Sequence, residues 1–183
     1  MIILASGSPR RRELLKTITP NFKVVISNID ESTIFCKNSE RAKEIARLKA
    51  YATSYQYPND IVIACDTVVI ESDEILGKPK SAKEAQMMLK RLSGKKHHVI
   101  TGYTIMGPGF EINRNAMTEV FFNQLDDALI DRYVASGSPL DKAGAYGIQD
   151  RDFPLVHHIS GSFTNVMGFP LEEISKYLSP YIK

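Results

Sequence analysis

The sequence is poor in cysteine and contains no long hydrophobic run. Only Cys36 and Cys65 occur among 183 residues, and they form neither a CxxC pair nor a metal-type cluster. We therefore expect free, buried thiols in a reducing compartment. No apolar run approaches about 18 residues, and the N-terminus lacks the basic and long apolar regions of a signal peptide. These absences predict a cytoplasmic protein that is not bound to a membrane.

A strong charge excess is also missing. The 23 Lys and Arg residues nearly balance the 21 Asp and Glu residues, which leaves a formal net charge of +2. There is no basic, aromatic-studded stripe either, so nucleic-acid binding is not expected. The motifs GxxxxGK(S/T), GxGxxG and GxSxG are absent, which excludes P-loop, Rossmann and serine-elbow sites.

What the chain does contain is typical of a folded globular protein. Its hydrophobic content is 43% and its charged content is 24%. The length suits one domain spanning residues 1–183, or two closely packed lobes that share a cleft. No internal repeat or low-complexity segment interrupts it.

The N-terminal segment combines a strand, a turn and a basic helix start. Residues 2–5 are apolar and predict a buried strand. Ser8 can cap the following helix, and Pro9 suits its first position because its missing N–H would have no partner there. Three arginines at positions 10–12 then lie at the positive end of the helix, which is unfavourable unless an anion binds among them. A solvated basic turn is the alternative interpretation.

The rest of the chain mixes helical and strand patterns. Residues 61–70 are apolar on both faces, which predicts a central strand covered on both sides. Ser81 and Glu84 form a capping box for a helix that ends near Gly94. The sequence therefore predicts an α/β protein with a mixed, twisted sheet flanked by helices. Further strands are expected at 22–26, after a 71–74 turn, at about 97–106 and 115–124, and at 156–159; further helices at about 9–17, for about sixteen residues from Ser39, and at about 126–135 and 170–178; and loops at 28–38 and 137–147.

Asp66 and Lys49 are charged residues at apolar positions. Asp66 interrupts the central strand, where a carboxylate is costly unless it is paired, hydrogen-bonded or bound to metal. It either serves a functional site or caps a neighbouring loop. Lys49 belongs to the inward face of its helix, because it follows Ile45 by four residues. It either serves the same site or extends its ammonium group to solvent.

Two kinds of unusual polar residue occur together in this sequence. Cations that contact phosphate oxygens, combined with carboxylates that hold a divalent metal, are typical of phosphoryl-transfer and phosphoanhydride-cleaving sites. Mg²⁺ commonly uses one or two carboxylates plus substrate phosphates. The histidine pairs at 97–98 and 157–158 do not place both rings on one face, so they are not favoured as ligands. The cations are Arg10, Arg11, Lys49 and Lys78, and the carboxylates are Glu31 and Asp66.

A series of short motifs, in order along the whole chain, resembles the Maf family of septum-formation-inhibitor proteins. That family consists of nucleoside triphosphate pyrophosphatases with two lobes around a nucleotide cleft, a fold similar to that of inosine triphosphatases. Each motif alone is weak, but together they are specific. The motifs are Leu4-Ala5-Ser6-Gly7-Ser8-Pro9-Arg10-Arg11, Cys65-Asp66-Thr67-Val68, Gly77-Lys78-Pro79, Leu92-Ser93-Gly94, Thr101-Gly102, the segment from Asp141 to Gln149, and Gly168-Phe169-Pro170-Leu171.

The resemblance implies roles for individual residues. The motifs look like those of the dTTP/UTP pyrophosphatase branch, in which water attacks the α-phosphorus and releases pyrophosphate and a nucleoside monophosphate. The divalent metal would be Mg²⁺ or Mn²⁺, and modified pyrimidine nucleotides are further expected substrates. By resemblance, Asp66 is the proton acceptor; Arg10, Thr67 and Gln149 set base specificity; Ser8, Arg11, Lys49 and Lys78 contact phosphates; and Glu31 and Asp66 are metal ligands.

Two positions depart from the family pattern. Residues 150–155 are bulky and charged where the family often has a glycine-rich turn, which leaves the shape of that rim open. Cys65 stands where a small residue is usual, either as inert packing or as an oxidation-sensitive thiol. Arg12 has no matching role and is expected in solvent.

The family resemblance leaves one functional alternative. A nucleotide-binding regulator of cell division would act through partner contacts, whereas an enzyme would depend on Asp66. A homodimer is also expected from the family.

Overall fold

The computed structural model describes residues 1–31 and 34–182, so residues 32 and 33 of the expected loop lie outside the described residues. Seven strands form one sheet in the order β2-β1-β3-β5-β6-β7, with β4 paired to β3. The strand β1 runs parallel to β2 and β3, and the other pairs are antiparallel. This confirms the predicted α/β class with a mixed sheet. The strands are β1 Ile2–Leu4, β2 Phe22–Val24, β3 Ile61–Glu71, β4 Glu74–Leu76, β5 Lys96–Gly107, β6 Phe110–Phe122 and β7 Val156–Ser160.

The strands and helices follow the predicted positions with a few differences. The strand β2 is shorter than expected, and β6 starts earlier because the tight turn pairs Gly107 with Phe110 and lets the hairpin continue without a gap. The expected loop 137–147 contains two short 3₁₀ turns, and a one-turn helix, α5, was not predicted. The helices are α1 Pro9–Ile18, α2 Asn38–Ser54, α3 Ala82–Leu92, α4 Asp127–Ala135, α5 Phe163–Val166 and α6 Leu171–Leu178, with 3₁₀ turns η2 Ser138–Asp141, η3 Ala143–Ala145 and η4 Ser179–Tyr181.

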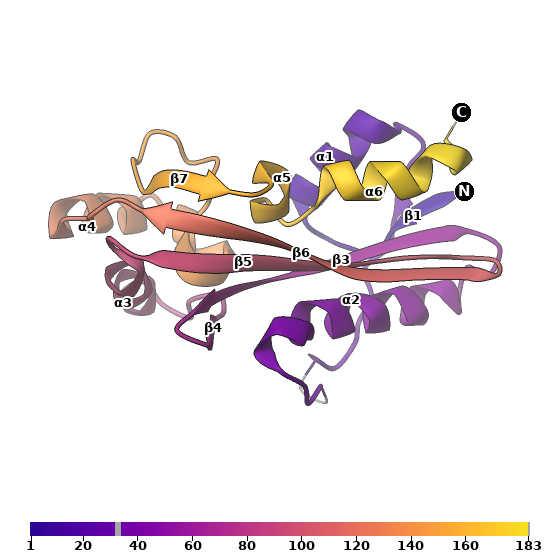
Figure 1. Cartoon of the computed structure of the whole chain (residues 1–183), viewed down its shortest axis with the longest axis horizontal. Helices are drawn as coiled ribbons and strands as arrows, with labels where there is room; N and C mark the ends of the chain where they lie inside the picture. The colour runs from indigo at the N-terminus through magenta and orange to yellow at the C-terminus, as the bar shows by residue number, and fades with distance from the viewer. Residues whose placement is uncertain (32–33, 183) are drawn as a thin grey trace.

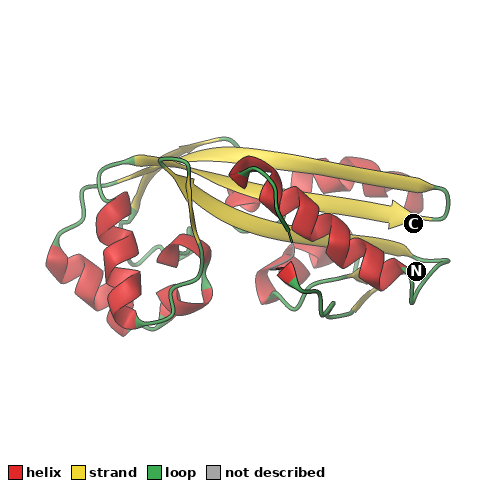
Figure 2. Ribbon diagram, turned by 90° about the horizontal axis from the view of Figure 1, so that it is seen from below, coloured by secondary structure: helices red, strands yellow, loops and turns green. Residues whose placement is uncertain are grey.

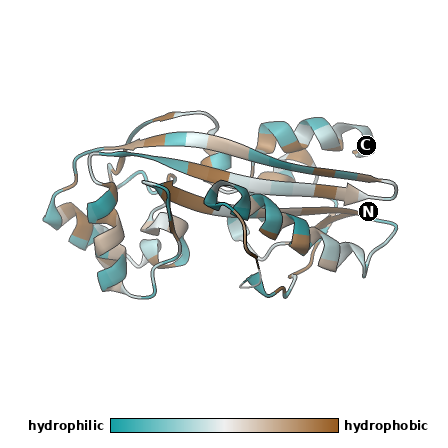
Figure 3. Ribbon diagram, turned by 60° about the horizontal axis from the view of Figure 1, so that its bottom comes forward, coloured by the Kyte–Doolittle hydropathy of each residue, from teal (hydrophilic) through white to brown (hydrophobic). Residues whose placement is uncertain are grey.

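Alternation along the strands places helices on both faces of the sheet. Ile2 and Leu4 pack with α1 and α6, whereas Ile3 packs with residues of α2 on the opposite face. Figure 1 shows α2 on one side of the long strands and α1 and α6 on the other. In Figure 3, brown, hydrophobic residues occur on the strands and also on the helices, where they alternate with teal, hydrophilic ones. The central strand is therefore covered on both faces, as its continuous apolar pattern predicts.

The long strands β3, β5 and β6 connect the two larger hydrophobic cores of the described residues. One core joins β1, α1 and α6 to one half of the strands. The other joins α3, α4 and the segment near Tyr146 to their opposite half. Figure 2 shows the helices in two groups along the length of the sheet. The middle of β3 lies between the two cores.

One edge of β3 is paired only at its ends. Residues 61–63 pair with β1 and residues 69–71 pair with β4 on that edge. Between them, no described strand pairs with residues 64–68 on this edge, whereas β5 pairs with them on the other edge. This interruption leaves backbone groups beside Asp66 available to other parts of the chain, and it determines where a cavity opens.

The helix starts show which capping predictions were right. The Ser81 hydroxyl accepts the Glu84 N–H at 3.1 Å, which confirms that cap, although the Glu84 carboxylate accepts from the Lys80 N–H instead of completing the box on Ser81. Ser8 does occupy the N-cap position of α1, but its side chain makes no capping bond, so that prediction was wrong. The local turn instead directs the Ser8 N–H to the Ser6 hydroxyl.

Candidate active site

A cavity of about 730 Å³ opens at the interrupted edge of β3. It lies between the two cores, where the β1–α1 turn, α2, the middle of β3 and two distant loops meet. This size is in the usual range for small-molecule and cofactor sites. Its described lining includes Ser6, Gly7, Ser8, Arg10, Arg11, Glu31, Arg41, Lys49, Asp66, Thr67, Gly77, Lys78, Asp141, Lys142, Tyr146, Gly147, Ile148, Gln149 and Gly168.

Charge in the cavity is unbalanced toward the positive. Among the described lining residues there are six cationic side chains and three carboxylates. The whole molecule carries a net charge of only +2, so its positive excess gathers in this one place. A concave site with this charge attracts and holds anions such as phosphates. Every candidate residue named from the sequence lies in its lining, so the structure brings the complete set together.

Asp66, Lys49 and Glu31 form an ion-pair group at the centre of this lining. The Lys49 ammonium donates to Asp66 Oδ1 at 2.8 Å and lies 2.9 Å from Glu31 Oε1. The Lys49 and Asp66 side chains are only 16% and 17% exposed, whereas Glu31 is 46% exposed. Lys49 therefore points to these carboxylates in the cavity lining and does not extend to bulk solvent. The pairing also accounts for a carboxylate within an apolar strand.

Glycine on the neighbouring strand lets α2 approach this group. Gly102 pairs with Asp66 in the sheet register. A Cβ atom on Gly102 would come within 2.2 Å of the Ala42 carbonyl carbon and the Lys43 nitrogen. Only glycine permits this contact between β5 and the start of α2. The same contact keeps α2, and with it Lys49, close to β3.

Arg11 is held by four acceptors of the protein itself. Its Nε donates to the Gly168 carbonyl at 2.8 Å, and its Nη1 donates to the Cys65 carbonyl at 2.8 Å. Further bonds reach the hydroxyls of Ser6 at 3.1 Å and Thr67 at 3.1 Å. The Cys65 carbonyl belongs to the unpaired edge of β3, so Arg11 substitutes for a missing strand there. Its predicted phosphate contact remains a prediction.

The three residues predicted to set base specificity lie on different elements. Arg10 Nη1 donates to Asp141 Oδ2 at 3.4 Å, so α1 reaches the opposite side of the cavity. Thr67 shares its hydroxyl with Arg11 and, at 3.0 Å, with Thr101. Gln149 is exposed in the cavity rim. Their roles in selecting a base stay predictions.

Ser8 and Lys78 line the cavity from different segments, the turn before α1 and the segment after β4. Ser8 closes the β1–α1 turn, and its uncommitted hydroxyl leaves the first N–H groups of α1 without a side-chain cap. Such N–H groups bind anions well. Lys78 is exposed and makes no ion pair with the described residues. Arg12 is exposed, as expected.

Sequence reasoning missed three charged members of the lining. Arg41 donates to the backbone carbonyls of Ile34 at 3.0 Å and Glu31 at 3.2 Å, which holds the loop that carries Glu31. Lys142 donates to Asp141 Oδ1 at 2.8 Å. Burial alone would raise the pKa of Asp141, but its bonds to Lys142 and Arg10 hold that pKa below the usual range. The 141–149 motif could have indicated the last two, whereas Arg41 has no local signal.

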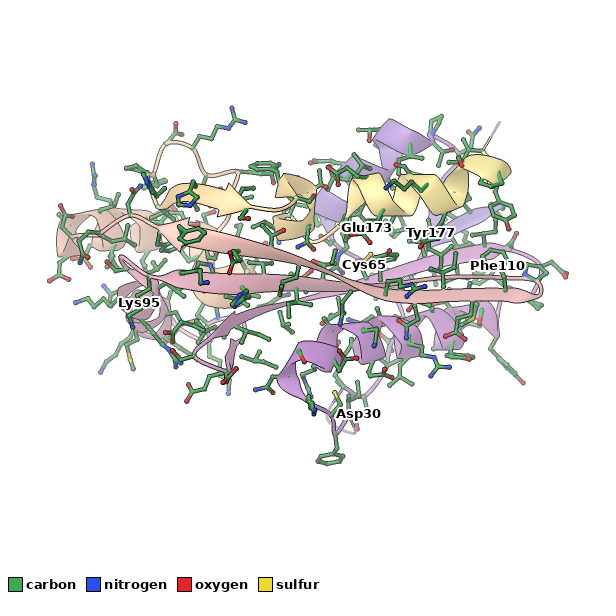
Figure 4. The ribbon with its side chains drawn as sticks, in the orientation of Figure 1. Asp30, Cys65, Lys95, Phe110, Glu173 and Tyr177 are labelled. Atoms are coloured by element: carbon green, nitrogen blue, oxygen red, sulfur yellow. The ribbon has the colours of Figure 1, made fainter. Side chains whose placement is uncertain are left out.

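The two cysteines differ in their surroundings. Cys65 is fully buried beneath the site, at the centre of the sheet in Figure 4, whereas Cys36 is exposed, which corrects the expectation that both are buried. Burial raises the pKa of the Cys65 thiol to about 12. The thiol therefore stays protonated at neutral pH, and inert packing is the interpretation that the structure favours.

The donor set is suited to a divalent metal shared with a substrate. Asp66 and Glu31 come from separate elements and converge on the same ammonium group. No cluster of three or more His, Cys, Asp or Glu side chains able to hold a metal occurs among residues 1–31 and 34–182. Two carboxylates with substrate phosphates and water are nevertheless a usual set for Mg²⁺. Asp66 and Glu31 therefore fit a metal that arrives with a phosphorylated ligand.

The fold and cavity define an α/β protein with a cleft for a phosphorylated small molecule. In the part of the chain that the structure describes, no helix is both long and apolar enough to span a bilayer. The chain belongs to the Maf family, because the family of Maf-like proteins matches residues 1–181. This confirms the resemblance drawn from the motifs.

Curated relatives cover nearly the whole chain. A dTTP/UTP pyrophosphatase of Thermococcus gammatolerans is 49% identical over 178 residues, which cover 96% of this chain and 94% of the relative. One of Thermococcus onnurineus is 47% identical and covers 96% and 95% of the two chains. One of Geobacillus sp. is 46% identical and covers 93% and 92%.

A solved structure shares the fold at low sequence identity. The Ham1 protein of Staphylococcus aureus superposes with a TM-score of 0.57, covers 98% of both chains and is 15% identical. This likeness supports the fold alone.

Proposed function

We propose that this chain hydrolyses dTTP and UTP to the nucleoside monophosphate and pyrophosphate in the cavity between its two cores. The observation that carries this proposal is the pairing of full-length similarity to dTTP/UTP pyrophosphatases with a cationic cavity that contains a central Asp–Lys pair. Modified pyrimidine triphosphates are further candidate substrates, because the same site would contact their phosphates.

Asp66 is the proposed proton acceptor for the attacking water. Its Oδ1 atom accepts from Lys49, and no described residue donates a hydrogen bond to its Oδ2 atom. Lys49 fixes the rotation of the carboxylate and lets Oδ2 orient or deprotonate a water molecule. A positioned general base typically contributes about 10²–10⁴-fold in rate.

Cations and backbone N–H groups stabilise the triphosphate. Lys78 and Lys49 lie in the lining, where negative charge increases at the α-phosphorus and on the leaving pyrophosphate. Ser8 and the first turn of α1 offer uncapped N–H groups to a phosphate oxygen. Arg11 contributes positive charge at this place while its hydrogen bonds hold the surrounding backbone.

Asp66 and Glu31 would hold the divalent metal, either Mg²⁺ or Mn²⁺. When bound, such an ion neutralises phosphate charge and polarises the scissile phosphoryl group. In this structure the single Lys49 ammonium pairs with both carboxylates and offsets one of their two negative charges. Arg10, Thr67 and Gln149 are the proposed base-selecting residues, of which Arg10 comes from α1 and Gln149 from the 141–149 segment.

A panel of nucleoside triphosphates tests this function. The purified chain is incubated with each nucleotide and Mg²⁺ or Mn²⁺, and the products are separated by chromatography. Monophosphate and pyrophosphate from dTTP and UTP are expected. Diphosphate and phosphate, or turnover of purine nucleotides only, would overturn the proposal.

The variant Asp66→Asn separates catalysis from mere nucleotide binding. We expect a loss of about 10²–10⁴-fold in turnover with an unchanged fold. The exposed Asp131→Asn variant, remote from the cavity lining, is the matched control and should retain activity. Full turnover by a folded Asp66→Asn protein would contradict the role of Asp66 and would favour the regulator.

A further inference from the structure

A polar cluster lies directly behind the 141–149 segment of the cavity. We call it the loop anchor, and it consists of Tyr133, Ser138, Lys142, Gly147 and Asp150. Asp150 is the first residue of the bulky stretch that departs from the family pattern. In the structure, Asp150 is connected through Tyr133 to Gly147, which lies in the segment that carries Gln149.

Asp150 is the central acceptor of the loop anchor. Its Oδ2 atom accepts from the Tyr133 hydroxyl at 2.5 Å and from the Ser138 hydroxyl at 2.7 Å. The Tyr133 hydroxyl in turn accepts the Gly147 N–H at 2.9 Å. Gly147 lies two residues before Gln149, so one continuous chain of bonds connects α4 to the cavity rim.

The Lys142 ammonium completes the loop anchor from the other side. It donates to the Ser138 carbonyl at 2.6 Å, to the Ser138 hydroxyl at 3.0 Å and to Asp141 Oδ1 at 2.8 Å. These acceptors match the three donors of an ammonium group. The Lys142 side chain is 13% exposed, so this cation supports the loop and is not directed to bulk solvent.

The backbone of the segment needs such support. Gly144 and Ala145 both have positive φ, at 69° and 59°, and Ala145 is a residue that rarely adopts this conformation. Strained backbone persists only where surrounding contacts hold it. After the strained residues, two hydrogen bonds fix the rim: the Gly147 N–H donates to the Tyr133 hydroxyl, and the Arg151 N–H donates to the Gln149 carbonyl at 2.8 Å.

We propose that the loop anchor positions Gln149 against the base of the nucleotide, so that Tyr133 and Asp150 are positioning residues for substrate selectivity. This inference rests on the proposed function. Asp66, Lys49 and Lys78 come from β3, α2 and the segment after β4, none of which contributes to the loop anchor. Loosening the anchor should therefore alter base selection and KM more than the chemical step.

The variant Tyr133→Phe removes the hydroxyl and keeps the ring that packs on Phe153. We expect the ratio of kcat/KM for dTTP over dCTP to fall by roughly 3- to 10-fold, mainly through KM, since the hydroxyl's bonds with Asp150 and with the Gly147 N–H are both lost. The matched control is Tyr103→Phe. Its buried hydroxyl donates to Glu173 at 2.6 Å in the other core, so it loses a comparable bond without touching the loop.

Amide hydrogen exchange tests the anchor without any substrate. Exchange at the Gly147 amide should increase about tenfold in Tyr133→Phe and stay unchanged in Tyr103→Phe. An inactive wild-type protein would overturn the proposed function, while exchange at Gly147 would still decide whether the anchor holds the loop.

Two variants of Asp150 separate its geometry from its charge. An asparagine oxygen can accept from both hydroxyls, so Asp150→Asn should retain selectivity within about twofold, whereas Asp150→Ala should behave like Tyr133→Phe. Wild-type selectivity and wild-type Gly147 exchange in Tyr133→Phe would overturn the inference. An equal loss of selectivity in Tyr103→Phe would also overturn it, because the effect would then be general destabilisation.

Discussion

The guanidinium of Arg11 contacts four acceptors of the protein, although its sequence position also suits a bound anion. Two of those acceptors, the carbonyls of Cys65 and Gly168, come from segments about a hundred residues apart in the chain. A planar group with donors on three nitrogens can satisfy such divergent acceptors, whereas an ammonium group cannot. At the scale of single residues, Arg11 is therefore a structural connection as well as a source of positive charge in the cavity.

The variant Arg11→Lys should lower the free energy of unfolding by about 2 to 4 kcal/mol, because buried acceptors lose their partners. Urea unfolding of the ligand-free protein measures this loss. The neighbouring Arg12→Lys variant is the matched control, and its exposed side chain should change stability by less than about 0.5 kcal/mol. Equal stability of the two variants would show that Arg11 has no structural role.

At the scale of elements, the site depends on how closely α2 approaches the sheet. The helix carries Lys49 to Asp66, and the approach is possible because Gly102 has no side chain. The backbone of Ala42 and Lys43 cannot rotate away as a flexible side chain would. Contact between these elements therefore determines both packing and the geometry of the Asp66–Lys49 ion pair.

The variant Gly102→Ala should force α2 away from β5. We expect a loss of about 1 to 3 kcal/mol in unfolding free energy, since overpacking displaces backbone. Gly77→Ala is the control for stability, because its added Cβ would meet no atom within 4 Å. An unchanged melting temperature in Gly102→Ala would contradict the close packing described here.

Local signals predicted many of these elements, and long-range pairing determined the rest. The strand β3 was predicted from its apolar run, and the helix α3 was predicted from its Ser81 cap. Both signals act locally in the sequence. The early start of β6 depends on its register with β5, and α5 is only one turn long, so neither has a strong local signal.

The candidate site was likewise predicted in part from local signals, and the rest of it depends on long-range contacts. Asp66 and Lys49 were recognisable because a charge at an apolar position needs a partner, and they are indeed partners. The interrupted edge of β3 depends on where β1 and β4 end, which no local pattern reveals. The loop anchor likewise depends on residues that meet only in the folded chain.

At the scale of the whole molecule, a buried histidine ties stability to pH. The His97 ring is 1% exposed, and its Nε2 atom pairs with the Tyr146 hydroxyl at 2.8 Å. Burial lowers the pKa of His97 from 6.5 to about 4, with His98 acting in the same direction and Glu71 opposing it. The folded protein therefore holds the neutral ring, while the unfolded chain binds a proton below pH 6.5.

Because folding lowers the pKa of His97, its effect on stability changes within a defined pH range. The contribution of His97 is fully present above pH 6.5 and is lost as the pH falls toward 4, by up to about 3 kcal/mol. Chemical unfolding at several pH values measures it. Between pH 6.5 and 4, the dependence of the unfolding free energy on pH should flatten in His97→Gln and persist in the exposed control His158→Gln. A persistent slope in His97→Gln would assign the effect to other groups.

The cleft between the two cores is the feature on which the proposed function depends, since it brings Asp66 together with the cations of the cavity lining. Hydrolysis of dTTP in ¹⁸O-labelled water, with Mg²⁺ present and the products weighed by mass spectrometry, tests it most directly. Attack at the α-phosphorus predicts one ¹⁸O atom in thymidine monophosphate and unlabelled pyrophosphate. Label in pyrophosphate, or release of thymidine diphosphate and phosphate, would contradict the account.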